Sequence, residues 1–155
     1  MPIPTPEQLA AFADAPTQLS AALTGLDNVQ IHFAPVEGEW SINEIIVHLA
    51  DAEVFYYERM RKTIAEDTPN ISSFDENAFA SRLSYSTQSF GLGLALFAAL
   101  RNSSAALLAI LPPEAWERAC NHPERGVMTL YDLFAAISGH SSAHLEQIEH
   151  LKQTM

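Results

Sequence analysis

Apolar residues recur along much of this chain at spacings of three and four residues, which is typical of amphipathic helices. One such stripe comprises Ile42, Ile45, Ile46, Leu49, Ala52, Tyr56 and Met60. A second stripe near the C-terminus comprises Leu130, Leu133, Ile137, His140, His144, Gln147 or Ile148, and Leu151. We find no segment that alternates apolar and polar residues as a half-exposed strand does. The pattern therefore predicts an all-α protein.

Residues that favour helix ends divide the chain into four long segments. Thr5 precedes Pro6 and an acidic residue, which is a typical first turn. Ser41 with Glu44 three residues later forms a capping box, and Thr129 caps the last segment. The predicted helices cover residues 5–24, 41–65, 87–111 and 129–155, with Pro16 expected to bend or divide the first.

The connections between these helices differ in length and composition. We expect a short helix at 75–83, one further turn at 114–119 and a loop at 121–126. Four amphipathic helices with uneven connections predict a four-helix bundle, and 155 residues suit one domain covering positions 1–155.

Composition and charge exclude several classes of partner. The formal net charge is −11, with 19 acidic residues against 8 Lys and Arg, so we expect no nucleic-acid binding and no docking on anionic membranes. The N-terminus lacks a signal peptide's basic and apolar regions, and the apolar run Phe90–Leu100 is too short to span a bilayer. With the single cysteine Cys120, these features predict a cytoplasmic protein.

Two histidines occupy core positions of the last predicted helix. His140 and His144 are four residues apart, so they share one face with Cβ atoms roughly 5–6 Å apart. Metal–nitrogen bonds of about 2.0–2.1 Å fit that separation. The neighbouring residues Gly139, Ser141, Ser142 and Ala143 are small, which leaves space beside the pair.

His48 is the natural third ligand, because it lies within a run of Ile, Val, Leu and Ala in the second predicted helix. A charged imidazolium would be costly to bury there, whereas a neutral imidazole bound to a metal would not. Three nitrogen donors from two helices leave coordination positions open, as catalytic sites do. The alternative is that these histidines are hydrogen-bonded in or near the core without a metal.

Other polar residues have less specific interpretations. Surface or loop roles are expected for His32, His122 and His150, and a reactive thiol at Cys120 is a minor alternative. Glu44 and Gln147 lie one turn from His48 and His144 and could orient an imidazole, although the capping box is the favoured role of Glu44. Glu53 is a poor fourth ligand unless it faces the bundle from the other flank. Glu44 and Tyr56 are unsupported guesses for a general base, so no catalytic residue is assigned.

The chain resembles the DinB-like family of DinB/YfiT-like metalloenzymes over most of its length. The resemblance rests on Glu39–Leu49, Arg101, His122–Gly126, Met128–Leu130 and His140–Ile148. Family members often place Asp directly after the first histidine of the HxxxH pair, where this chain has Ser141.

The resemblance implies an up-and-down four-helix bundle with an uncommon helix order. It also implies a three-histidine site for Zn, Ni, Fe or Mn, formed by His48, His140 and His144. Characterised relatives include S-transferases and isomerases that use low-molecular-weight thiols.

Together, the residues and the resemblance favour a metal-dependent thiol S-transferase or hydrolase that acts on a small-molecule substrate, with a low-molecular-weight thiol as an optional co-substrate. A non-catalytic bundle that binds a metal or a small ligand is the alternative. Because apolar bundles of this size often pair, a homodimer is also open.

Overall fold

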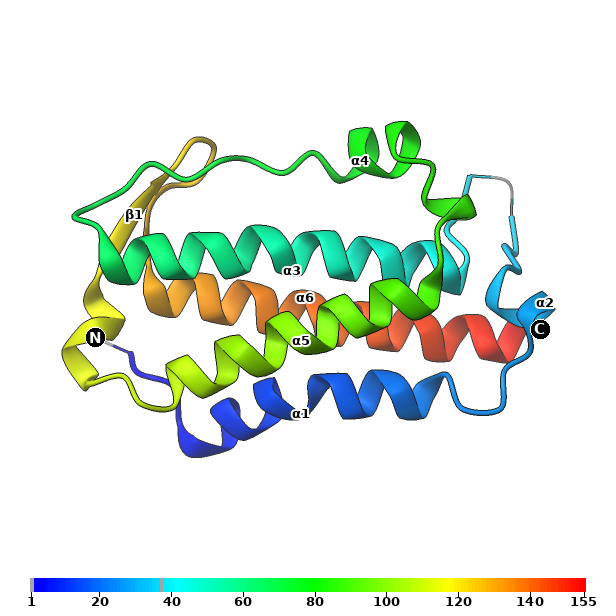
Figure 1. Ribbon diagram of the computed structural model, residues 1–155, viewed down its shortest axis with the longest axis horizontal. Coiled ribbons are helices and arrows are strands. Elements are labelled where there is room, and N and C mark those ends of the chain that lie inside the picture. Colours follow the sequence, from blue (N-terminus) through cyan, green and yellow to red (C-terminus); the bar gives the residue numbers. More distant parts are fainter. Residues whose placement is uncertain (1, 37) are drawn as a thin grey trace.

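The computed structural model describes residues 2–36 and 38–155, and it is built around four long helices (Figure 1). These are α1 (Pro6–Ala22), α3 (Ile42–Ala65), α5 (Phe90–Leu108) and α6 (Leu130–Thr154). Thr5, Ser41 and Thr129 each form a capping box at the start of a helix, as their sequence predicts. The predicted four-helix bundle is therefore confirmed. Pro16, which was expected to bend or divide the first helix, does not divide it, because α1 is continuous through this residue.

The helices are not packed in the order of the chain. α5 packs against both α1 and α3, and α6 packs against the same two helices from the other side. Figure 1 shows that α3 and α5 run in the same direction, because the connection between them returns along the length of the bundle. The uncommon helix order expected from the family resemblance is thus present.

This returning connection carries α4 (Glu76–Arg82) and a 3₁₀ turn, η1 (Tyr85–Thr87), and it lies along the outer side of α3 (Figure 1). Asp75 caps α4, close to the predicted start at 75. Two hydrogen bonds attach the end of the connection to α3. The Tyr85 hydroxyl donates to Asp51 over 2.6 Å, and Asn43 Nδ2 donates to the Tyr85 carbonyl over 2.9 Å. The connection is therefore fixed over one face of α3.

Two small elements were not predicted. A single helical turn, α2 (Asn28–Ile31), follows α1, and an antiparallel hairpin of β1 (Ala119–His122) and β2 (Gly126–Thr129) stands where we expected a loop. Four-residue strands are too short to show alternation in the sequence. Gly126 ends the hairpin turn with a φ of +73°, which favours glycine. The predicted turn after residue 113 is present as η2 (Pro113–Glu117).

The apolar helix α5 is longer than its most hydrophobic run suggested. By length and composition alone it is sufficient to cross a membrane, so the expectation that this region is too short was wrong on that criterion. In the structure α5 packs along α1 and α3 and places Arg101 in the core of the bundle. Core helices of soluble proteins meet the same criterion and are mostly buried, whereas 22% of the α5 window is buried.

The Arg101 side chain forms a buried polar network between the helices. Its Nε and Nη2 atoms donate to the two carboxylate oxygens of Glu53 on α3 over 2.8 and 2.7 Å, and both side chains are fully buried. Nη2 also donates to Ser141 Oγ on α6 over 2.7 Å, and the guanidinium carbon lies 4.2 Å from the centre of the Phe12 ring on α1. One guanidinium therefore contacts all four long helices.

Replacing Arg101 by methionine should lower the free energy of unfolding by about 3–5 kcal/mol, because Glu53 would keep a buried and unpaired charge. The double variant Arg101→Met, Glu53→Leu should recover most of this loss. Urea unfolding followed by circular dichroism measures both. As a control, Lys152→Met disrupts the partly exposed ion pair with Glu149 and should change the free energy by less than about 1 kcal/mol. Equal effects of Arg101→Met and Lys152→Met would contradict a structural role for the buried pair.

Candidate metal centre

Three imidazole nitrogens from two helices meet between α3 and α6. His48 on α3 places its Nε2 atom 2.9 Å from His140 Nε2 on α6, and His144 Nε2 lies 3.2 Å from the same atom. The three ligand atoms all lie within 4.8 Å of one another. The structure therefore brings together all three residues that the sequence selected.

The two separations from His140 Nε2, 2.9 and 3.2 Å, fit a shared cation. Two nitrogens bound to one ion at about 2.0–2.1 Å, with angles between those of octahedral and tetrahedral sites, lie about 2.9–3.4 Å apart. Neutral imidazole is a ligand common to Zn, Ni, Fe and Cu. A single divalent ion bound by His48, His140 and His144 is thus compatible with the observed arrangement.

Burial keeps these imidazoles neutral. His48 is fully buried, and desolvation together with the nearby His140 and His144 lowers its pKa to about 3. Desolvation, His144 and the Arg101 charge lower the pKa of His140 to about 4. Neutral rings are the form that binds metal, so no proton has to be displaced from these two rings near pH 7.

The outer ring nitrogens differ in their contacts. His144 Nδ1 lies 2.8 Å from Gln147 Oε1, so Gln147 orients this ring, as predicted from its position one turn away. The Nδ1 atoms of His48 and His140 are buried without a hydrogen-bond partner. Glu44 instead caps its own helix by accepting from the Ser41 amide over 2.9 Å, which was the favoured prediction.

Aromatic rings enclose the imidazoles. The Trp40 ring lies 4.8 Å from that of His48 and stacks on His144 at 6.4 Å between ring centres. Phe74, from the connection between α3 and α5, stacks on His48 at 5.9 Å and continues into a cluster with Phe55 and Phe79. The rings limit the access of water to the nitrogens.

Glu76 is the acidic residue that approaches the imidazoles. Its Oε2 atom lies 3.7 Å from His48 Nε2, and its side chain is 54% exposed. Sequence reasoning missed Glu76 and Phe74, because the predicted short helix at 75–83 gave no indication that this connection returns along α3 to the imidazoles. The Asp75 cap at the start of α4 was the one available signal that this segment is ordered.

Two cavities adjoin the bundle core. A cleft of about 660 Å³ is lined by Trp40, Asn77 and Gln147, together with Pro35, Val36, Gly38, Glu39, His150, Leu151 and Thr154. None of the three imidazoles lines this cleft, but Trp40 packs against His48 and Gln147 contacts His144. A second cavity of about 260 Å³ lies between α1, α5 and α6 and reaches Arg101 and Ser141, but no histidine lines it. The first cleft is therefore the candidate substrate site.

The other candidates are located away from the imidazoles. His32 and His150 are exposed, as expected. His122, in contrast, is buried within β1, so the prediction of a surface role was wrong for this residue. The Cys120 thiol is fully buried and donates to the Met128 carbonyl over 3.6 Å. These features argue against the minor alternative of a reactive thiol at Cys120. Glu53 is paired with Arg101 and is not a ligand.

Titration of the metal-free protein with zinc should show one bound ion per chain. His144→Ala should weaken zinc binding more than about 100-fold, and Gln147→Ala by about 10-fold, because Gln147 only orients the ring. Isothermal calorimetry measures both affinities. His150→Ala, an exposed histidine on the same helix, should leave the affinity unchanged. A similar loss in His144→Ala and His150→Ala would exclude the three-histidine site.

The metal-free protein should lose stability as pH falls from about 6.5 towards 4. In that range the unfolded chain binds protons on His48 and His140 that the folded chain does not bind. The free energy of unfolding therefore decreases as the pH decreases. Each histidine contributes a slope of up to about 1.4 kcal/mol per pH unit. Chemical unfolding of the wild type and of His48→Asn between pH 7 and pH 5 isolates this contribution. Equal slopes in the two proteins would refute it.

Comparison with known proteins places these features in a family. The family model of the DinB superfamily matches residues 11–148. A protein of Oceanobacillus iheyensis named "putative metal-dependent hydrolase" is 30% identical over 145 residues, which cover 94% of this chain and 84% of the relative. A Bacillus licheniformis protein with the same description is 32% identical, covering 91% and 81%.

The fold agrees with this relationship. The structure of YfiT from Bacillus subtilis, described as "a probable metal-dependent hydrolase with an unusual four-helix bundle topology", superimposes with a TM-score of 0.89 at 25% identity. The match covers 99% of this chain and 90% of YfiT. The chain belongs to the DinB superfamily.

Proposed function

We propose that this protein is a metal-dependent enzyme that hydrolyses a small molecule or transfers a low-molecular-weight thiol to it. The observation that carries the proposal is the convergence of three Nε2 atoms near a cleft that Trp40 and Gln147 line. When bound there, a divalent ion would lower the pKa of a water or a thiol and so supply a nucleophile at neutral pH. The names of the relatives favour hydrolysis.

The remaining residues have distinct tasks in this scheme. Gln147 holds the His144 ring in one orientation, with the Nδ1 proton directed to Oε1. Trp40 and Phe74 cover the rings and lower the local polarity. The Glu76 carboxylate lies on the exposed side and is placed to accept a proton from the nucleophile at Oε2. Because it is half exposed, it can return that proton to solvent.

Substrate size and location are part of the same proposal. A cleft of about 660 Å³ admits a small molecule. The reaction is expected in the cytoplasm, where the buried and unpaired Cys120 remains reduced. A homodimer stays a prediction that the size of the particle in solution tests.

Assays on the zinc-loaded and nickel-loaded protein should detect turnover. One arm follows the hydrolysis of activated esters and amides, and the other follows the consumption of glutathione, bacillithiol or mycothiol with chloro-aromatic or epoxide electrophiles. His144→Ala should lower kcat/KM at least about 100-fold, while His32→Ala, which changes an exposed histidine outside the cleft, keeps it. Glu76→Gln should lower kcat about 10²- to 10⁴-fold with unchanged metal content, because it removes a proton acceptor but no ligand.

The outcomes separate the classes of protein. Activity that survives His144→Ala would contradict the enzyme described here. Stoichiometric metal binding without turnover in either arm would favour the alternative, a bundle that binds a metal or a small ligand without catalysis.

A further inference from the structure

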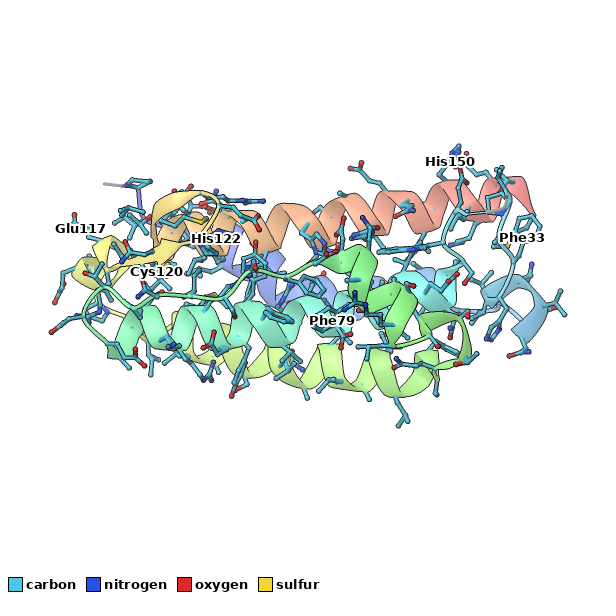
Figure 2. The ribbon with its side chains drawn as sticks, turned by 90° about the horizontal axis from the view of Figure 1, so that it is seen from above. Phe33, Phe79, Glu117, Cys120, His122 and His150 are labelled. Atoms are coloured by element: carbon cyan, nitrogen blue, oxygen red, sulfur yellow. The ribbon has the colours of Figure 1, made fainter. Side chains whose placement is uncertain are left out.

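Basic side chains gather at the hairpin end of the molecule, away from the three imidazoles. Arg59 comes from α3, His122 ends β1, and Arg125 lies in the hairpin turn. Figure 2 shows His122 on the hairpin, towards the opposite end of the molecule from His150. In a chain with only 8 Lys and Arg and a net charge of −11, such a grouping needs a physical explanation.

Hydrogen bonds between segments that are distant in the sequence bring these residues together. Arg59 Nη2 donates to the Ser72 carbonyl over 2.5 Å, in the segment that follows α3. That segment pairs with β1, since the Asn121 amide donates to the Pro69 carbonyl over 2.8 Å and the Ile71 amide donates to the Asn121 carbonyl over 3.1 Å. His122 is the next residue of β1, so the strand sets it beside the guanidinium.

The Arg59 guanidinium is buried without an ion pair. The residue is 3% exposed, its Nε atom is buried without any partner, and none of the ion pairs in the described part of the chain includes it, although the Glu58 carboxylate contributes a favourable charge. The rings of Phe55 and Tyr56 lie 5.7 and 5.0 Å from its central carbon. Arg101, by contrast, donates two hydrogen bonds to Glu53. Buried guanidinium groups generally have such a partner.

His122 presents a second donor at the same place. Its Nδ1 atom accepts hydrogen bonds from the amides of Glu124 and Arg125 over 3.1 and 3.3 Å, so the neutral ring carries its proton on Nε2. Burial and the positive charges of Arg59 and Arg125 lower the pKa of His122, so both guanidinium groups lie close enough to act on this ring electrostatically. The remaining ring nitrogen of His122 is therefore a hydrogen-bond donor, and the Glu124 carboxylate contributes the one opposing charge among the groups that act on this ring.

We propose that Arg59, His122 and Arg125 form a binding site for the anionic group, a carboxylate or a phosphate, of a small molecule. Such a group accepts several hydrogen bonds at once and supplies the counter-charge that the guanidinium lacks. Arg125 is exposed, whereas Arg59 and His122 are buried, so an anion would reach the cluster from the side of Arg125. Because the molecule as a whole is acidic, a small anion fits this site better than a polyanion such as nucleic acid. This site does not depend on the proposed activity.

Calorimetric titration with inorganic phosphate and with succinate tests the site. The protein is first freed of metal and chelator, and the ionic strength is held constant with sodium chloride. At least one of the two anions should bind with one site per chain, and the one that binds more tightly identifies the class of group. Arg125→Gln should weaken that binding about 5- to 10-fold, and Arg59→Gln more strongly, because each removes a charged donor.

Matched controls keep this test decisive. Arg82→Gln removes the same charge from an exposed position at the end of α4 and should leave the dissociation constant unchanged. If Arg59→Gln fails to fold, Arg125→Gln still tests anion binding, because the Arg125 side chain makes no hydrogen bond in the described part of the structure. The wild type should also show a shift of the His122 imidazole resonances on saturation. Absence of saturable binding, or equal weakening in Arg125→Gln and Arg82→Gln, would overturn the proposal.

Discussion

The bidentate ion pair between Arg101 and Glu53 fixes how α3 and α6 are aligned, and the metal centre depends on that alignment. Glu53 lies five residues after His48 on α3, and Ser141 directly follows His140 on α6. Arg101 binds both Glu53 and Ser141, so a slip of one helix along the other would break these hydrogen bonds as it separates the imidazoles. Apolar packing is non-directional and resists such sliding weakly, whereas a forked hydrogen-bond geometry resists it strongly.

The second constraint is the direction of the chain. Because α3 and α5 run in parallel, residues 66–89 must travel back along the bundle, and this path covers one side of α3 (Figure 1). The path delivers Phe74 and Glu76 to the imidazoles. A bundle with alternating directions and short connections would leave that face open to water. The uncommon helix order and the enclosure of the site are therefore linked.

The sequence predicted what depends on local patterns. Capping residues located the starts of α1, α3 and α6, and helical spacing placed His140 and His144 on one face. The third candidate ligand, His48, followed from an imidazole in an apolar run considered together with the His140 and His144 pair, because a single buried histidine is also compatible with a hydrogen-bonded core role. These predictions needed only neighbouring residues, because each rests on a helix turn or on the cost of burial.

What the sequence could not predict depends on contacts between distant segments. The strands β1 and β2 are four residues each and form because Gly126 permits the turn and residues 69–71 supply a third edge. His122 therefore looked like a loop residue although it is buried. Glu53 appeared only as an unsuitable ligand, because its partner Arg101 is 48 residues away.

The electrostatics of α3 divide the molecule into two regions. His48 and Arg59 are eleven residues apart, about three turns, so they lie on nearly the same face roughly 16 Å from each other. Near His48, the Glu76 carboxylate lies 3.7 Å from Nε2, which favours a cation there. Near Arg59, the Arg125 charge favours an anion, although the Glu58 carboxylate opposes it. Phe55 and Phe74 lie between these regions, and their apolar rings reduce the screening that water would provide. One face of α3 thus has a region that favours a cation and a region that favours an anion. The charge in each region depends on the side chains that the returning connection and the hairpin bring to α3.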